Sequence, residues 1–291
     1  ARDNEVSKFF FSSSACVYAS FHQNSLSGAP LKESDAYPAD PEDGYGWEKL
    51  FSERMCRHFY EDYGLETRVA RYHNVYGPMG TFDGGREKAP AALCRKLITA
   101  KNSQEKKIDV WGDGEQTRSF MFIDDCIKGT KKIFESNCRE VLNIGSEEQV
   151  SINQMIKIIE EIADYKVEKN YQLDKPKGVR GRSSNNDLVR EKLGWDFETS
   201  LKSGLEITYK WIEKEIAKKL NNNKFTKIIS LRNKIAKKIN LPKNWIFSDK
   251  EIIRNIKNEK ISIISKNLKK TEIKNLTKLI TNFKKNFNKV S

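Results

Sequence analysis

A tyrosine and a lysine four residues apart, Tyr45 and Lys49, form the clearest chemical pattern in the chain. Positions i and i+4 of a helix lie on one face, so both side chains can reach the same small volume. A free phenol is a weak base at neutral pH, but a nearby ammonium group favours the phenolate and makes proton transfer useful. The pair can therefore take a proton from a substrate hydroxyl. Taken alone, the spacing favours an exposed tyrosine and a solvated lysine, because it occurs by chance in many helices.

A serine-rich strand end upstream favours the catalytic interpretation. Ser13, Ser14 and Cys16 follow the strand-like apolar run at residues 9–11. Open parallel sheets place ligands beyond the carboxyl ends of their strands. A hydroxyl or thiol from this strand end can hold a substrate oxygen beside the tyrosine. Cys16 is then either an acid/base thiol or a small buried apolar residue.

Several other residues suit an anionic or polar ligand. A glycine turn at residues 84–85 can bring Arg86 or Lys88 close to an anion. Guanidinium groups suit diphosphate recognition, and three arginines lie in extended or glycine-flanked segments, namely Arg118, Arg180 and Arg182. Asn74, after a strand-like segment, is a hydrogen-bonding candidate. Each of these residues also fits an ordinary surface position.

The three histidines have no spacing suited to metal ligation, and we predict no metal site. The five cysteines are not closely paired, which argues against a disulfide framework and favours a reducing cytoplasm. The apolar runs are short and broken by charge, so no membrane span is predicted.

The elements that position these residues follow an α/β pattern. Residues 1–220 alternate between strand-like and helix-like stretches, as in a parallel sheet with crossover helices. Strands are predicted from residue 9 and at 67–72, 108–111 and 141–144, and a turn at 77–78 closes the second. Helices are predicted at 45–63, from Ser151 through apolar residues 152–162, and at about 205–220.

The positive charge of the chain lies in its last quarter. The chain carries a net charge of +13, and residues 221–291 hold 19 of its Lys and Arg residues but only 4 of its Asp and Glu residues. The run Asn221-Asn222-Asn223 marks the change in composition, and we place a domain boundary there. Apolar periodicity at about 228–239, 249–256 and 272–287 predicts a small all-α bundle.

Residues 1–220 resemble the GDP-mannose 3,5-epimerase family of the extended short-chain dehydrogenases/reductases. The resemblance rests on Tyr45 with Lys49 and on several further segments, at residues 13–18, 31–36, 71–78, 84–92, 111–114, 118–124, 143–146, 178–182 and 193–195. It implies part of a Rossmann-type doubly wound parallel sheet with a smaller substrate-binding α/β lobe.

The resemblance also implies a reaction and a cofactor. Tyr45, aided by Lys49 and Ser14, would take a proton from the sugar 4-hydroxyl while hydride passes to NAD. The resulting 4-ketone would acidify the C3 and C5 protons, which Cys16 and Lys88 would remove and return. The products would be GDP-L-galactose or GDP-L-gulose. The implied substrate-binding residues are Ser13, Asn74, Arg86, Arg118, Arg180 and Arg182.

Family members begin with a glycine-rich strand–turn–helix that holds the NAD pyrophosphate on backbone amides. No such segment precedes the serine strand in this sequence. We therefore expect the first four sheet strands and the NAD loop to be missing and a wide apolar sheet edge to be exposed. The 291-residue polypeptide alone should bind NAD poorly and be inactive or prone to aggregation. The complete family member is expected to be a homodimer.

The segment from 231 to 249 resembles the helicase-and-RNase-D C-terminal domain of ribonuclease D. This resemblance implies a nucleic-acid partner for residues 221–291, although lysine-rich composition alone explains the charge almost as well. Three alternatives remain open. The chain could belong to another NDP-sugar 4-epimerase or 4,6-dehydratase, act as a nucleic-acid-binding protein, or join two unrelated pieces by an assembly error.

Overall fold

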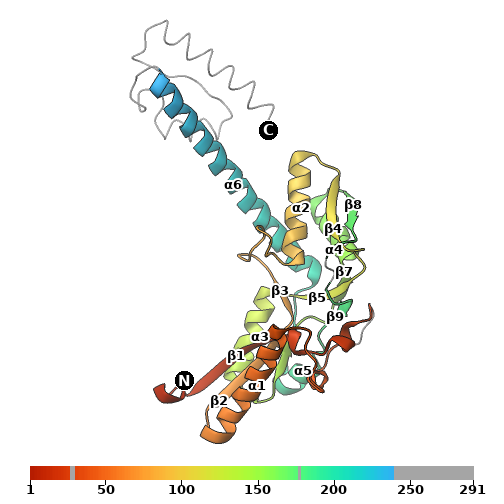
Figure 1. Ribbon diagram of the computed structural model, residues 1–291, viewed down its shortest axis with the longest axis vertical. Helices are drawn as coiled ribbons and strands as arrows, with labels where there is room; N and C mark the ends of the chain where they lie inside the picture. The colour runs from red at the N-terminus through yellow and green to blue at the C-terminus, as the bar shows by residue number, and fades with distance from the viewer. Residues whose placement is uncertain (27–29, 176–177, 239–291) are drawn as a thin grey trace. The chain divides into compact units, whose positions relative to one another are not determined.

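A computed structural model describes residues 1–26, 30–175 and 178–238 (Figure 1). The chain divides into two compact units, Ala1–Glu213 and Lys214–Ser291. The first unit is an α/β structure with parallel strand pairs, which confirms the predicted fold class. The predicted segments at 249–256 and 272–287, and with them most of the predicted bundle, lie outside the described residues.

The first sheet carries the predicted serine strand. Its three parallel strands are β1 (Lys8–Ser14), β2 (Glu66–Tyr72) and β6 (Leu142–Ile144), in the order β1-β2-β6. Helix α1 (Gly44–Tyr63) connects the first two strands and lies beside them in Figure 1. The Asp43 carboxylate accepts a hydrogen bond from the Gly46 amide at the start of this helix. The strands and the helix match the positions predicted from the sequence.

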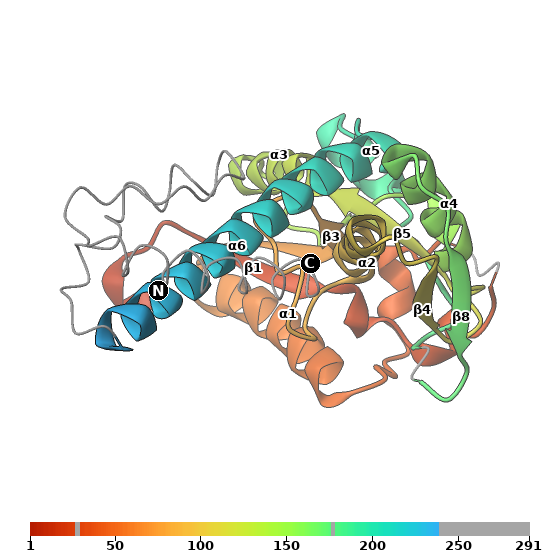
Figure 2. The same cartoon turned by 90° about the horizontal axis from the view of Figure 1, so that it is seen from above.

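The remaining strands form a four-stranded sheet and a two-stranded sheet. β5 (Thr117–Phe122) pairs in parallel with β3 (Asn74–Tyr76) and β9 (Gly181–Arg182), and antiparallel with β7 (Gln149–Ser151). β4 (Lys107–Trp111) and β8 (Glu168–Gln172) pair in parallel and lie side by side in Figure 2. The turn at residues 77–78 therefore closes β3 and not β2, contrary to the prediction. His73 separates the two strands, which join different sheets.

A helix covers β4 and packs against a second helix. α2 (Ala89–Ser103) packs against β4 and against α4 (Ile152–Ala163). Ser151 caps α4 as predicted, because its hydroxyl accepts from the Gln154 amide while the Gln154 side chain accepts from the Ser151 amide. The apolar face of α4 is buried at its predicted positions, except that Ile162 is half-buried. The short 3-10 turns are η1 (Arg2–Asn4), η2 (Ala15–Val17), η3 (Ser20–Gln23) and η4 (Glu33–Ala36).

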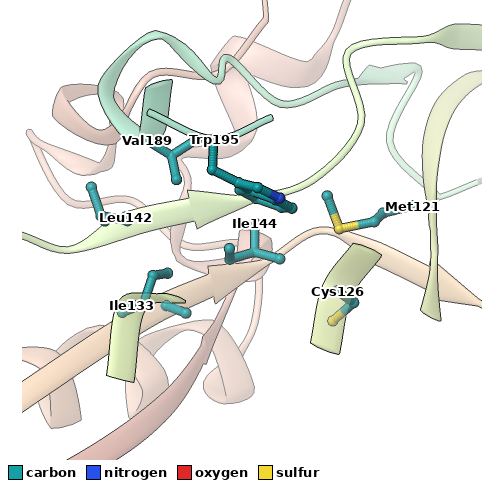
Figure 3. Close-up of a cluster of buried hydrophobic side chains, with 8 residues drawn as sticks. Met121, Cys126, Ile133, Leu142, Ile144, Val189 and Trp195 are labelled. Carbon is teal, nitrogen blue, oxygen red and sulfur yellow. The ribbon is translucent and has the colours of Figure 1, made fainter. Parts of the chain in front are cut away.

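A buried apolar cluster joins the first sheet to α3 (Ile123–Glu135) and α5 (Asp187–Leu193). Figure 3 shows the Trp195 ring lying over Ile144. A Cβ atom at Gly129 would meet both of these side chains, so α3 approaches the sheet closely only because this position has no side chain. The cluster consists of Ala70, Met121, Cys126, Ile133, Leu142, Ile144, Val189 and Trp195.

Helix α6 (Leu201–Lys238) is longer than the sequence predicted. We expected a helix at 205–220 and a break at the asparagine run, but the helix passes through residues 221–223. Asparagine costs only a fraction of a kcal/mol in a helix, and no proline or glycine follows Gly204 before Pro242. The prediction that the helix ends near residue 220 is wrong. The domain boundary at that point stays a prediction.

Within the described ranges, β1 pairs only with β2 and forms an edge of its sheet. Phe9 on this strand is 39% exposed. No helix in these ranges combines the length and apolar character needed to cross a membrane. The same residues contain no group of three or more His, Cys, Asp and Glu side chains arranged to hold a metal ion.

Candidate active site

Tyr45 and Lys49 lie on one face of α1, one turn apart. The Lys49 Nζ atom lies 5.4 Å from the centroid of the Tyr45 ring and 4.9 Å from that of Phe11 on β1. It also donates a hydrogen bond of 3.0 Å to the carbonyl oxygen of Ser12. Tyr45 itself is half-exposed. Lys49 is thus tied to the strand end, while the phenol beside it remains accessible to a ligand.

Ser14 and Cys16 turn the chain where β1 ends. The Ser14 hydroxyl accepts a 3.2 Å hydrogen bond from the Cys16 amide and caps the 3-10 turn η2. The first turn of α1 packs directly against this turn at Gly46, where a Cβ atom would collide with the Cys16 carbonyl oxygen. The neighbouring residue is Tyr45. The helix that carries Tyr45 (the tyrosine helix) and the turn η2 that carries Cys16 (the cysteine turn) are therefore in backbone contact.

A cavity of about 620 Å³ brings three predicted residues together. Asn74, Lys88 and Arg118 all line it, from β3, the start of α2 and β5. The Asn74 amide donates to the Ser119 carbonyl at 3.1 Å, which fixes its orientation. Burial, and then the nearby Arg182 cation, lower the pKa of Arg118 to about 10.

The other two arginines contact protein groups beside this cavity. Arg180 forms a 3.1 Å ion pair with Asp113. Arg182 donates from Nε to Gln23 Oε1 at 2.5 Å, and its Nη1 lies 3.9 Å from the Cys16 sulfur. Of the three predicted arginines, Arg118 thus lines the cavity and Arg182 lies at the cysteine turn.

Two predicted residues lie apart from these groups. Ser13 is 3% exposed and donates its hydroxyl hydrogen to Glu53, so its side chain is used inside the protein. Arg86 is exposed on the loop before α2 and is not part of the cavity lining, unlike its neighbours Glu87 and Lys88. Residues of one β-strand alternate between two faces, so Ser13 and Ser14 cannot both face a ligand.

Among the cavity residues that were not predicted as site residues are Trp111 and Gln116. Trp111 is 56% exposed at the end of β4. The Gln116 amide nitrogen donates to the Trp111 carbonyl at 3.1 Å, while its Oε1 is buried and has no hydrogen-bond partner in the described part of the chain. The sequence did contain a signal for Trp111. Apolar and polar residues alternate along residues 107–111, and the tryptophan occupies a position on the solvent-facing side of that strand. Trp111 thus offers a stacking surface in the cavity, and Gln116 adds a polar side chain to its lining.

A buried histidine next to the site should make stability pH-dependent. Burial, and then the Arg182 cation, lower the pKa of His73 to about 3. In the unfolded chain an imidazole takes a proton near pH 6.5, so between these values the unfolded state binds one more proton. The free energy of unfolding should therefore fall as the pH falls, by about 1.4 kcal/mol per pH unit from this group between pH 6 and 4.5.

Urea titrations at several pH values measure this slope. The variant His73→Gln should lose the contribution of His73 to the pH dependence of the free energy of unfolding. The variant His58→Gln, at an exposed position of α1, should keep the wild-type slope. Equal slopes in the wild type and His73→Gln would contradict the expectation.

Comparison with known sequences relates these residues to nucleotide-sugar enzymes. Residues 1–145 match the NAD dependent epimerase/dehydratase family. Over 218 residues the chain is 49% identical to a GDP-mannose 3,5-epimerase of Arabidopsis thaliana and 50% identical to GDP-mannose 3,5-epimerase 1 of Oryza sativa subsp. indica. Each alignment covers 75% of this chain and 56% of the relative. The chain thus spans about half the length of the curated relatives that it matches.

Solved structures of nucleotide-sugar epimerases are also similar to this chain. The chain is similar to a UDP-glucose 4-epimerase with UDP-glucose from Thermotoga maritima, with a TM-score of 0.66 and 28% identity, covering 74% of this chain and 66% of the other. It is also similar to a UDP-glucuronic acid 4-epimerase from Bacillus cereus in complex with UDP-glucuronic acid and NAD. The TM-score there is 0.60 at 28% identity, covering 73% and 63% of the two chains.

Proposed function

Because residues 1–145 of this chain belong to the NAD dependent epimerase/dehydratase family, we propose that the chain carries the catalytic and sugar-binding part of a nucleotide-sugar epimerase. Its substrate is GDP-mannose, and its products are GDP-L-galactose or GDP-L-gulose. The observation that carries the proposal is the contact between the tyrosine helix and the cysteine turn. These two elements bear Tyr45, Lys49 and Cys16, and the chain is about 50% identical to two GDP-mannose 3,5-epimerases.

The cavity suits the nucleotide part of this substrate. The exposed Trp111 indole offers a face on which a base can stack. Gln116 lines the same cavity and is a candidate for hydrogen bonding to the base. Arg118, in the same cavity, is a candidate for the diphosphate, and Arg180 and Arg182 are candidates beside it.

NAD fits the open side of α1. The half-exposed Tyr45 hydroxyl and the Lys49 ammonium group form a donor pair suited to ribose hydroxyls. When bound there, NAD supplies the acceptor for the hydride that leaves C4 of the sugar. Ser14, at the strand end, is the candidate that orients the sugar 4-hydroxyl.

The chemistry of the chain's own residues is proton transfer. The Tyr45 phenolate, stabilised by the Lys49 cation, takes the proton of the sugar 4-hydroxyl. A ketone at C4 then makes the C3 and C5 protons acidic. Of Cys16 and Lys88, one removes a proton at such a carbon and the other returns one on the opposite face. Tyr45 finally gives its proton back to the oxygen at C4.

Deuterium incorporation tests the proposal in a completed enzyme, in which the glycine-rich NAD-binding segment of a relative is joined before residue 1. Turnover of GDP-mannose in deuterated water should label C3 and C5, as NMR of the recovered sugar would show. Cys16→Ala and Lys88→Met should each abolish epimerisation at C3 and C5, because inversion needs one group to remove a proton and the other to return one on the opposite face. The oxidation at C4 should survive both changes.

The same experiment separates the rival activities. A plain 4-epimerase needs no acid/base pair at C3 and C5, so it would invert C4 without label at either carbon. A 4,6-dehydratase would release water and keep a 4-ketone. Either result would overturn the proposal.

We also propose a cellular compartment and partners for this chain, as the family resemblance suggests. All five cysteines are free, which suits the cytoplasm. A homodimer and a nucleic-acid partner for residues 221–291 remain predictions. Gel filtration of the completed enzyme, and salt-dependent RNA binding by the full chain, test them.

A further inference from the structure

A fully buried ion pair lies beneath the proposed catalytic pair. Arg71 donates to both carboxylate oxygens of Glu53, from Nε to Oε1 at 2.9 Å and from Nη2 to Oε2 at 2.6 Å. Each side chain is 3% exposed. Neither residue lines the cavity or faces the open side of Tyr45. The pair therefore has no direct part in the chemistry proposed above.

The pair connects elements that carry reacting groups. Glu53 lies on α1 and Arg71 on β2, and Glu53 Oε1 also accepts the Ser13 hydroxyl hydrogen. Ser13 and Arg71 are register partners across β1 and β2, so one carboxylate binds both members of a strand pair. Arg71 Nη1 further donates to the Glu33 carbonyl at 2.7 Å.

The helix presents three residues of this region on one face. Tyr45, Lys49 and Glu53 follow one another at intervals of four residues. Lys49 contacts the Ser12 carbonyl and Glu53 contacts the Ser13 hydroxyl, so consecutive helix turns bind consecutive strand residues. A shift of α1 along β1 by one strand residue, about 3.3 Å, would break both contacts and the ion pair.

Stability alone does not account for such a pair. Removing two charges from water costs several kcal/mol each, and apolar residues of similar volume often replace a buried pair without loss of stability. Apolar side chains cannot reproduce the two parallel hydrogen bonds that a guanidinium group donates to a carboxylate, and these bonds are directional. The pair thus selects one placement of the helix among many that would pack equally well.

We propose that Glu53 and Arg71 are positioning residues that hold Tyr45 and Lys49 in register with the end of the serine strand. The proposal rests on the proposed function, because that function makes Tyr45 and Lys49 the reacting pair. It goes beyond that function, because it assigns the alignment of the catalytic residues to an ion pair that does not contact the substrate.

The decisive variant replaces both partners by apolar residues of similar length, Glu53→Met with Arg71→Met. Its melting temperature should stay within a few degrees of the wild type. In the full 291-residue chain, the amides of residues 48–51 should exchange with deuterium about tenfold faster than in the wild type, while those of β6 should keep their rate. The matched control is Arg57→Gln with Glu61→Gln, which removes an exposed ion pair of the same helix and should leave these rates unchanged.

Kinetics of the completed enzyme provide the second measurement. The double variant should lower kcat about 10- to 100-fold and change KM for GDP-mannose less than about threefold, because a small misplacement affects the reacting groups more than the nucleotide cavity. A folded double variant with wild-type exchange and wild-type kcat would overturn the proposal. If the wild-type enzyme shows no turnover, the proposed function fails, and the exchange rates alone decide on the positioning.

A double variant that does not fold is replaced by Ser13→Ala, which removes only one anchor of the Glu53 carboxylate. Exchange of the same amides should then accelerate about threefold without a change in fold. Unchanged exchange in Ser13→Ala would equally overturn the proposal.

Discussion

Replacing Tyr45 by phenylalanine is expected to lower kcat of the completed enzyme by about 10²- to 10⁴-fold, the usual contribution of a positioned acid/base group. The phenol has the right surroundings for this role, because it is half-exposed and lies next to the Lys49 cation. Phenylalanine keeps the ring and removes only the proton carrier. Since Tyr45 does not line the cavity proposed to hold the nucleotide, KM for GDP-mannose should change much less than kcat.

Steady-state rates with GDP-mannose provide the measurement, and the control comes from the same helix. Tyr63, in the last turn of α1, is 55% exposed, so Tyr63→Phe makes the same chemical change at similar exposure. It should keep kcat within about twofold. A Tyr45→Phe enzyme with a kcat near that of the wild type would remove the tyrosine from the mechanism.

Replacing Trp195 by alanine should destabilise the first unit by about 3–5 kcal/mol, the usual cost of removing a large buried aromatic side chain. Trp195 is 7% exposed and packs against Ile144, as Figure 3 shows. It also lies against the backbone of Gly129. The void would open between α3 and the first sheet, and the surrounding strands could close it only in part. Urea unfolding of the full chain, followed by far-ultraviolet circular dichroism, measures the change.

Trp111→Ala is the matched control, because this indole is 56% exposed. It should alter the free energy of unfolding by less than about 0.5 kcal/mol. If the two tryptophan variants were equally stable, the cluster around Trp195 would not be the core that its burial indicates.

The elements around the reacting residues were predictable because their signals are local. The phenylalanine run predicted β1, and the helical periodicity together with its serine cap predicted α4. Tyr45 and Lys49 could be paired from spacing alone, since a helix fixes which residues share a face. The family resemblance added the shared acid/base role of Cys16 and Lys88, which no local pattern connects.

What the sequence could not predict depends on contacts between distant segments. The cavity is built from residues 74 to 152, and only the fold brings Trp111 and Gln116 beside Asn74 and Arg118. Ser13 and Ser14 look equivalent in the sequence, yet the strand turns one toward Glu53 and the other toward the cysteine turn. The length of α6 was underestimated because a change in composition is not a helix stop signal.

Gly46 has a consequence for how sequence variation in such enzymes is interpreted. It bears no functional group, yet the backbones of the tyrosine helix and the cysteine turn touch only because this position is bare. Even the smallest added side chain would push the phenol away from the thiol by forcing the two backbones apart. A variant at this glycine would thus resemble a catalytic knockout in a genetic screen, although it leaves every reacting group in the polypeptide.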